Sequence, residues 1–455
     1  MKSQPTRPSR ETTLSATPRS RVSPMSKRHR VVVVGGGAGG IELAIGLARR
    51  ADATADEVVL IDRESSHLWK PRLHEVAAGL MKPGEDQAGY LVLAQEHGFR
   101  FHYGALAGLD SSARTIGLAA VENTAGEVVL SPRELDYDDL VLAFGSQVND
   151  FGIEGVVEHC HMLDSSAQAS AFNRSFLNAA MQIAEGQREH LAVGIVGAGA
   201  TGVELAAELS HAASAMKRYG GLGAANWLSI TIVDMADRVL AGADMRTSAY
   251  AAARLNALGV KIELNRVVSQ VTAAGLHLKG GETIPCDLRV WASGITGQPI
   301  VHSLSDLQIS KQNRIITDPR LGCSGVEHIY AIGDCAAVPD GHGASALPAT
   351  AQVAHQQASY LADALARRRR AKQVPPFIYR PRGSLVSLGP SEAAGEFPAL
   401  RHGCSAVLAR GVVPKLLYAS LLHLHRAAMH GWKRAVALAA SDRLRRIAVP
   451  PVKLH

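Results

Sequence analysis

One short pattern occurs twice in this chain of 455 residues and constrains its fold more than any other feature. In each copy an apolar strand is followed by a glycine-rich turn, a helix and a second strand. The first copy places these elements at residues 31–34, 35–40, 38–50 and 58–62, and the second at 192–196, 197–202, 203–216 and 228–234. Continuous apolar runs of this length are typical of strands buried in a parallel sheet. The repeat therefore predicts an α/β protein with two nucleotide-binding halves.

The first turn reads Gly-Gly-Gly-Ala-Gly-Gly and predicts a dinucleotide site. Its first glycine allows the tight turn, its third lets the backbone approach a pyrophosphate, and its last lets helix and strand pack closely. The start of the following helix offers N–H groups to the phosphates. Asp62 ends the next strand, where a carboxylate can accept hydrogen bonds from ribose hydroxyls. The predicted binding residues are Gly35, Gly37, Ala38, Gly39, Gly40 and Asp62.

The second turn has the same spacing, with Gly197, Gly199 and Gly202 in the three glycine positions. Asp234 ends the strand that follows, and the longer interval before it suggests an insertion over residues 211–227. A carboxylate there repels a 2′-phosphate, so NADH is favoured over NADPH. Arg238 lies close enough in sequence to weaken that preference.

A third pattern indicates which cofactor each half binds. The run Ile329–Ala336 contains Gly333-Asp334 and resembles the second FAD motif of flavoproteins with two dinucleotide domains. The runs 137–146 and 290–294 resemble the two crossover segments of the same proteins, with Phe144 where threonine is usual. The resemblance implies FAD in the first half and NADH in the second. It also implies that Asp334 accepts a hydrogen bond from the flavin's ribityl chain, and that Gly145 and Gly294 lie against FAD and NADH respectively.

Several further runs resemble the type II NADH:quinone oxidoreductases, the single-subunit respiratory NADH dehydrogenases of bacteria. They are His67-Leu68-Trp69-Lys70-Pro71 and residues 73–79, 199–209, 348–356, 382–389 and 452–455. The match covers the chain from about residue 28 onward. It implies two Rossmann-type domains, one nested in the other, and hydride transfer from NADH to FAD followed by two-electron reduction of a membrane quinone. It implies no proton pumping and a homodimer.

The run 348–356 contains the family's A-Q-x-A-x-Q motif. Gln352 and Gln356 are four residues apart, so on a helix they share one face. The resemblance implies that their amides bind the quinone carbonyls near the flavin, and that Ala351 and Gln352 contact FAD. Hydrogen bonding at a helix start is the structural alternative.

Two charged residues also take roles from the resemblance. Glu204 matches a glutamate near the nicotinamide and flavin, where a buried carboxylate can relay protons for quinol formation, although a structural acceptor is the alternative. Lys70 is expected at the flavin's phosphates. His355 receives no role.

The repeat and the motifs together predict a domain map. Residues 28–150 and 296–385 form the FAD domain, residues 151–295 the NADH domain and residues 386–455 a C-terminal segment of amphipathic helices. Residues 1–27 are rich in Ser, Thr, Pro and Arg and are predicted to be a disordered extension; Met25 is an alternative start.

The charge of the chain is unevenly distributed. The overall charge is +7, but the first 30 residues carry +7 and the last 55 carry +9, which leaves −9 for the middle. Residues 415–436 read as one amphipathic helix with Lys415, His423, Arg426, His430 and Lys433 on one face. No apolar run is long enough to span a bilayer. The basic helix is expected to lie on an anionic lipid surface, at the cytoplasmic face of the inner membrane, rather than on nucleic acid. Packing of this helix on the protein or on a second subunit is the structural alternative.

Five scattered cysteines form no C-x-x-C pair, which argues against a disulfide framework, a metal site and a thiol-redox centre. Sulfide:quinone oxidoreductase has a similar fold but needs paired cysteines near the flavin. A protein that binds FAD and NADH and signals by docking its basic surface is a second alternative.

Overall fold

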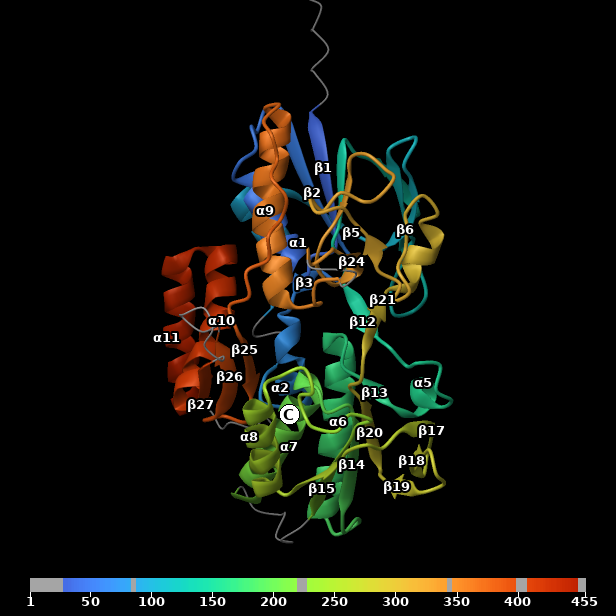
Figure 1. Ribbon diagram of the computed structural model, residues 1–455, viewed down its shortest axis with the longest axis vertical. Coiled ribbons are helices and arrows are strands. Elements are labelled where there is room, and N and C mark those ends of the chain that lie inside the picture. The colour runs from blue at the N-terminus through green and yellow to red at the C-terminus, as the bar shows by residue number, and fades with distance from the viewer. Residues whose placement is uncertain (1–27, 83–86, 219–226, 342–345, 398–406, 449–455) are drawn as a thin grey trace, which may run out of the picture.

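A computed structural model describes residues 28–82, 87–218, 227–341, 346–397 and 407–448. The extension predicted over residues 1–27 lies outside the described residues. Two five-stranded parallel sheets form the body of the molecule, one above the other in Figure 1. Each sheet has its own buried apolar cluster.

The first sheet has the strand order β23-β11-β1-β2-β5, and all its neighbours are parallel. Its strands are β1 (His29–Val34), β2 (Asp56–Asp62), β5 (Arg100–Tyr103), β11 (Asp139–Leu142) and β23 (Ile329–Ala331). Helices α1 (Ala38–Ala48) and α9 (Ala351–Arg369) lie side by side against it (Figure 1). Val32, Ile41 and Leu140 are fully buried between these layers. The apolar run at 31–34 is therefore the central strand that its composition predicts.

The second sheet repeats the plan with the order β13-β20-β14-β15-β16. Its strands are β13 (His161–Met162), β14 (Leu191–Val196), β15 (Leu228–Val233), β16 (Val260–Glu263) and β20 (Leu288–Trp291). It is covered by α6 (Ser166–Ala184), α7 (Ala200–Arg218) and α8 (Met245–Ala257). In the interval 211–227, where an insertion is expected, helix α7 continues to Arg218; residues 219–226 lie outside the described residues.

The chain crosses between the sheets twice, and the two crossings pair with each other. Strand β12 (Ser146–Val148) leaves the first sheet and is antiparallel to β21 (Ile295–Gly297), which returns towards it. Strand β23 then joins β11 in the first sheet. The second unit is thus inserted in the first, and the predicted pair of Rossmann-type domains, one nested in the other, is confirmed.

Smaller elements lie between the main strands. They are α2 (Leu73–Ala77), α4 (Tyr90–His97), β6 (Leu106–Asp110), β7 (Thr115–Leu118), β10 (Arg133–Asp136), β17 (Val268–Thr272), β18 (Gly275–Leu278) and β19 (Thr283–Pro285). Helix α2 packs between α6 and α7. It therefore carries residues 73–77 from the first unit onto the second.

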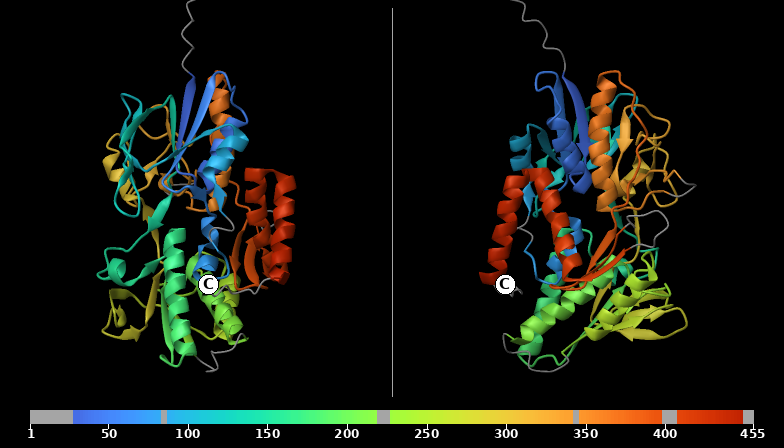
Figure 2. Two further views of the ribbon diagram at one scale, coloured as in Figure 1. Left: turned by 180° about the vertical axis from the view of Figure 1, so that it is seen from behind. Right: turned by 60° about the vertical axis from the view of Figure 1, so that its left-hand side comes forward.

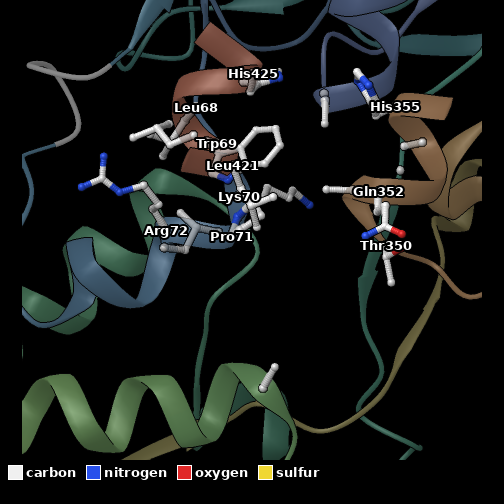
Figure 3. Close-up of a pocket in the computed structure, with 18 of the residues that line it drawn as sticks. Leu68, Trp69, Lys70, Pro71, Arg72, Thr350, Gln352, His355, Leu421 and His425 are labelled. Atoms are coloured by element: carbon white, nitrogen blue, oxygen red, sulfur yellow. The ribbon is translucent and has the colours of Figure 1, made fainter. Parts of the chain in front are cut away.

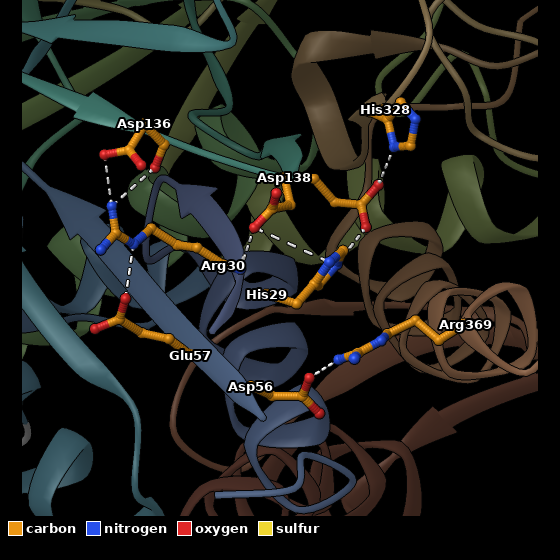
Figure 4. A network of polar contacts seen from close by, with 9 residues as sticks. His29, Arg30, Asp56, Glu57, Asp136, Asp138, His328 and Arg369 are labelled. Carbon is orange, nitrogen blue, oxygen red and sulfur yellow. Dashed lines mark hydrogen bonds and ion pairs between the residues drawn. The ribbon is translucent and has the colours of Figure 1, made fainter. Parts of the chain in front are cut away.

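A polar network closes the amino-terminal edge of the first sheet, shown in Figure 4. The buried carboxylate of Asp139 lies 2.9 Å from Nε2 of His29 and 3.1 Å from Nδ1 of His328. Arg30 donates to Glu57 and Asp136 at 2.7 and 2.8 Å. Because His328 directly precedes β23, Asp139 joins the strand that begins the first sheet in the sequence to the strand that completes it.

The C-terminal segment forms an antiparallel sheet followed by two helices. The strands are β25 (Ser384–Ser387), β26 (Ala393–Phe397) and β27 (Val407–Gly411), and the helices are α10 (Val412–His430) and α11 (Trp432–Ala448). Figure 2 shows both helices on one side of the body. The single helix expected over 415–436 is wrong, because Gly431 has a φ of +78° and ends α10.

The orientation of α10 also differs from the expectation. Lys415 donates to the hydroxyl of Ser387, and Arg426 is buried in an ion pair with Asp442. The exposed positions on the two helices are largely apolar: Val413, Leu416, Leu417, Leu421, Leu424, Trp432, Val436, Leu438 and Leu444. Ser387 in the strand β25 holds Lys415, and Asp442 of α11 holds Arg426, so both basic side chains are turned away from the exposed leucines. Within the described ranges no helix combines the length and apolar character needed to cross a bilayer.

Candidate functional site

A cavity of about 2230 Å³ lies where the two Rossmann units and α10 meet. The first unit contributes its glycine turn, the second contributes the start of α7, and the C-terminal segment closes one side with α10. In parallel α/β sheets, ligands bind at the carboxyl ends of the strands. The cavity occupies that position for both sheets.

The first glycine turn has the geometry of a phosphate cradle. Gly35 has a φ of +103°, and a Cβ on Gly40 would lie 1.8 Å from the Gly35 carbonyl oxygen, so neither position admits a side chain. A Cβ added to Gly37 would meet nothing within 4 Å. Gly37 lines the cavity, so the backbone is open to a ligand there. A pyrophosphate fits this open turn at the start of α1.

Asp62 lies beside this turn, at the end of β2. Its carboxylate accepts the Gly36 N–H at 2.5 Å and the Glu64 N–H at 2.8 Å, and burial raises its pKa. A carboxylate has about four acceptor positions, so two backbone bonds leave capacity for ribose hydroxyls. Asp62 both shapes the turn and lines the cavity.

The other residues predicted for FAD surround the same space. Asp334 lies in the middle of a short 3₁₀ helix (Gly333–Cys335) and accepts the Ser146 hydroxyl at 3.0 Å. Ala351 is the first residue of α9, and Lys70 is exposed at the rim. All of them line the cavity, as do Ala38, Gly39 and Gly145.

The second glycine turn repeats the geometry of the first. Gly197 has a φ of +111°, and a Cβ on Gly202 would lie 2.0 Å from the Gly197 carbonyl oxygen. Asp234 accepts the Ala198 N–H at 2.5 Å, as Asp62 does in the first unit. The position of Gly199 is open in the same way as that of Gly37. The turn therefore has the shape of a second nucleotide cradle.

The predicted NADH residues divide into two groups. Glu204 and Gly294 line the cavity, whereas Gly197, Gly199, Gly202 and Asp234 do not. Arg238 donates to the Ala241 carbonyl and pairs with Asp237. The second glycine turn and the part of the second unit that lines the cavity are thus separate surfaces.

Glu204 is the buried acid at the meeting point of the two units. Its carboxyl accepts the Ser387 N–H at 2.9 Å and lies 3.3 Å from Nδ1 of His74. Burial raises the pKa of Glu204 to about 8 and lowers the pKa of His74 to about 4. At neutral pH the acid therefore holds a proton while the histidine is neutral.

Helix α10 supplies two polar neighbours of Glu204 that the sequence reasoning missed. Lys415 donates to the Ser387 hydroxyl at 2.7 Å, and Tyr418 hydrogen-bonds Glu204. The helical period of residues 415–436 instead places Lys415 on the basic face that is expected to meet lipid. Its proximity to Glu204 depends on the docking of α10, which the helical period alone does not reveal.

The two glutamines of the A-Q-x-A-x-Q run share a face, and both bind the segment 379–383. Gln352 donates to the Gly383 carbonyl and accepts from the Tyr379 hydroxyl and the Arg382 N–H. Gln356 exchanges two hydrogen bonds with the backbone of Arg380. Gln352 lines the cavity and Gln356 does not. This geometry favours a structural role for Gln356 and not contact with a ligand in the cavity.

A second buried acid, Glu42 on α1, escaped the sequence reasoning. It accepts from Nδ1 of His425 at 2.7 Å and pairs with His355, to which no role was assigned. Burial alone would raise the pKa of Glu42, but the hydrogen bonds from the two histidines outweigh it and lower the pKa to about 2. A glutamate among the buried apolar residues of an amphipathic helix was the available signal.

The cavity wall opposite α9 is largely apolar, with Lys70 and Arg72 among its residues. Figure 3 shows Leu68, Trp69, Pro71 and Leu421 on this side, with Gln352 and Thr350 across the gap. The ring of Trp69 lies 4.0 Å from that of His425. A flat, apolar ligand with polar oxygens fits a space with this lining.

Cysteines take no part in the site that the structure describes. Cys160, Cys286, Cys323 and Cys335 are free thiols away from the cavity lining. Burial raises the pKa of Cys335 to about 12, so it is an inert thiol. In the described ranges no group of side chains has the composition of a metal site.

The profile of the pyridine nucleotide-disulphide oxidoreductase family matches residues 29–358. A type II NADH:quinone oxidoreductase of Haemophilus influenzae is 34% identical over 93% of this chain and 99% of its own length. A demethylphylloquinone reductase of Synechocystis is 27% identical over 85% of this chain and 91% of its own length.

Solved structures give the same fold. NDH2 of Plasmodium falciparum in complex with NADH superposes with a TM-score of 0.75 at 19% identity, covering 89% of this chain and 97% of its own. The sulfide:quinone oxidoreductase of Aquifex aeolicus superposes with a TM-score of 0.70 at 17% identity, covering 92% and 95%. At these identities the likeness concerns the fold alone.

Proposed function

The chain belongs to the type II NADH:quinone oxidoreductases of the pyridine nucleotide-disulphide oxidoreductase family, and from this premise we infer that it is an FAD-dependent enzyme that oxidises NADH and reduces quinone. The first glycine turn, Asp62 and Asp334 would hold FAD, which when bound would supply an acceptor for the hydride of NADH and a donor of two electrons to the quinone. The protein aligns the reactants and controls where protons and water reach them.

The observation that carries this function is the single cavity shared by three surfaces. The open glycine turn at Gly37 fits a pyrophosphate, Glu204 lies at the start of the second unit's helix, and the wall of Trp69 and Leu421 is apolar. A dinucleotide and a hydrophobic acceptor can therefore meet in one space. The chemistry of NADH oxidation by quinone needs such an arrangement.

We propose that Glu204 holds a proton used in quinol formation. Quinol takes up two electrons and two protons, and a hydride brings both electrons but only one proton equivalent. Because burial raises the pKa of Glu204 to about 8, this acid is protonated at neutral pH. Ser387 and Lys415 connect it to α10, through the bonds described above.

Gln352 is our candidate for quinone binding. Its Nε2 has two protons and donates one to Gly383, so the second remains for a quinone carbonyl. FAD is proposed to bind the residues of the first glycine turn together with Asp62, Lys70, Gly145, Asp334 and Ala351. Asp234 is proposed to bind the ribose of NADH. Gln356 is proposed to hold residue 380 and, through it, the segment beside Gln352.

Sulfide:quinone oxidoreduction is not favoured. Its chemistry needs a pair of redox cysteines at the flavin, and the four described cysteines are absent from the cavity lining. The remaining alternative, a signalling protein without turnover, has no observation in its favour.

We propose that the enzyme is peripheral to the cytoplasmic face of the membrane. The exposed leucines of α10 and Trp432 of α11 would enter the interface. In α10 the basic residue Lys415 binds Ser387 and Arg426 pairs with Asp442 of α11, so lipid contact is assigned to the apolar surface. The exposed Lys433 and Arg443 of α11 remain available to anionic headgroups. A homodimer stays a prediction.

Purified holoenzyme tests the function directly. We expect a yellow protein that NADH bleaches under anaerobic conditions and that quinone then restores, with steady NADH:quinone turnover. Sulfide should not replace NADH. Flavin reduction without quinone turnover would instead support the signalling protein.

A further inference from the structure

A continuous chain of buried hydrogen bonds runs from α10 to the first glycine turn. Nδ1 of His425 lies 2.7 Å from Glu42, Nε2 of His425 lies 2.8 Å from Nε2 of His67, and Nδ1 of His67 lies 2.9 Å from the Gly36 carbonyl oxygen. The side chains of His425 and Glu42 are 2% and 7% exposed, and His67 is equally buried. Three segments distant in sequence, at residues 36–42, 67 and 425, are thus joined by one series of hydrogen bonds.

The Gly36 carbonyl determines which group donates in each hydrogen bond of this series. The Gly36 carbonyl can only accept, so Nδ1 of His67 donates. Burial lowers the pKa of His67 to about 3, so its ring is neutral and Nε2 accepts. Nε2 of His425 must then donate.

The other end of the series is the carboxylate of Glu42. Nδ1 of His425 lies 2.7 Å from it, so the His425 ring is held between Glu42 and His67. The ring of Trp69 packs against the His425 ring, with 4.0 Å between the ring centroids.

The chain ends on the peptide that shapes the phosphate cradle. The Gly36 carbonyl also accepts the Tyr90 hydroxyl at 2.8 Å, and the Gly36 N–H donates to Asp62. In a trans peptide the carbonyl and the following N–H point in opposite directions. Holding the carbonyl towards His67 and Tyr90 therefore turns the Gly37 N–H away from them, at the residue that opens onto the cavity.

We propose that His425 is a positioning residue for FAD: through His67 it holds the Gly36–Gly37 peptide in the orientation that receives the pyrophosphate, so that FAD retention depends on the contact between His425 of α10 and His67. The inference rests on the proposed function only for the identity of the cofactor. It does not require that NADH or quinone react.

Other contacts dock the same end of α10 without touching the chain. His97 lies 2.5 Å from the Met429 carbonyl oxygen, and Arg49 donates to the Ala428 carbonyl at 3.3 Å. They provide a matched control, because His97→Ala weakens docking but leaves His425, His67 and Glu42 in place.

The test measures FAD affinity of apo-protein, prepared by removing the flavin from the full chain, with apo-protein unfolding monitored in parallel. His425→Phe and His67→Phe keep a ring but lose every donor, and each should weaken FAD binding about tenfold, or about 1.4 kcal/mol. The double variant should bind like either single variant, because residues that act in series are not additive. His97→Ala should stay within about twofold.

A cavity variant separates positioning from packing and serves if the phenylalanine variants do not fold. His425→Gly leaves room for added imidazole, which should restore FAD affinity, whereas toluene of similar size should not. Unchanged FAD affinity in folded His425→Phe, fully additive losses, or equal rescue by toluene would each overturn the proposal. Absence of NADH:quinone turnover would count against the function and leave this measurement unaffected.

Discussion

At the scale of single residues, two buried glutamates have opposite protonation because their partners differ. Glu42 faces two histidines that donate to it, and it is ionised. Glu204 lies in a dry site where burial prevails over the Ser387 N–H and Tyr418, and it keeps its proton. Neither state follows from the residue type, since an exposed glutamate would be ionised at neutral pH.

The raised pKa of Glu204 makes stability depend on pH. A folded-state pKa of about 8, above the unfolded value of 4.5, gives stability that is complete below pH 4.5 and is lost as pH rises through 8. Glu204→Gln removes the titration but keeps the volume. We expect near wild-type unfolding free energy at pH 6, and about 2–3 kcal/mol greater stability than wild type at pH 9. Denaturant unfolding at both pH values measures this; parallel pH profiles for the two proteins would contradict it.

Substitution of Gln352 and of Gln356 should have different effects on the rate of quinone reduction. Gln352→Ala removes an amide that lines the cavity, so quinone turnover should fall at least tenfold while flavin reduction by NADH changes less than about twofold. Stopped-flow measurement of each half-reaction tests this. Gln356→Ala is the matched control, and should mainly lower stability, by about 1–2 kcal/mol for two backbone bonds. Equal losses in both half-reactions of Gln352→Ala would refute its role.

At the scale of elements, the discontinuous first domain needs a closure, and the network of Figure 4 provides one. Asp139→Asn cannot accept from both His29 and His328 as a carboxylate does, and we expect a loss of about 2–4 kcal/mol in unfolding free energy. Asp136→Asn is the control, because the Asp136 side chain is 47% exposed and should cost less than about 1 kcal/mol. Similar losses in both variants would show that Asp139 has no special role in closing the domain.

The helices α10 and α11 are expected to bind lipid through their apolar face. Leu424 is 64% exposed, and Leu424→Glu should reduce partitioning to anionic vesicles about tenfold or more. Met181→Glu on α6 is the control, with 58% exposure on another helix. Co-sedimentation with liposomes distinguishes them. If the two variants lose binding equally, the effect is one of added charge and not of this face.

At the scale of the whole molecule, sequence order predicted the fold well because its strongest signals are local. Gly35, Gly40, Gly197 and Gly202 occupy positions where backbone would collide with a Cβ or where φ is positive, so steric requirement and sequence pattern coincide. The acids Asp62 and Asp234 follow for the same reason, since each binds its own turn.

The parts that were not predictable depend on contacts between distant segments. The helical period of residues 415–436 identified a polar and an apolar face, but period alone does not say which face is covered. A glycine at position 431 is compatible with one continuous helix, and only its positive φ shows that α10 ends there. Likewise Lys415 and His425 reach buried acids on α7 and α1, and a pattern within α10 carries no information about either partner.

The placement of α10 has a practical consequence for anyone who wishes to handle this enzyme without detergent. Truncation before Val412 would remove the exposed apolar residues of α10 and α11. It would also remove Lys415, Tyr418 and His425, which contact the interior. Replacing the exposed leucines by polar residues one at a time is therefore a better route to solubility than truncation.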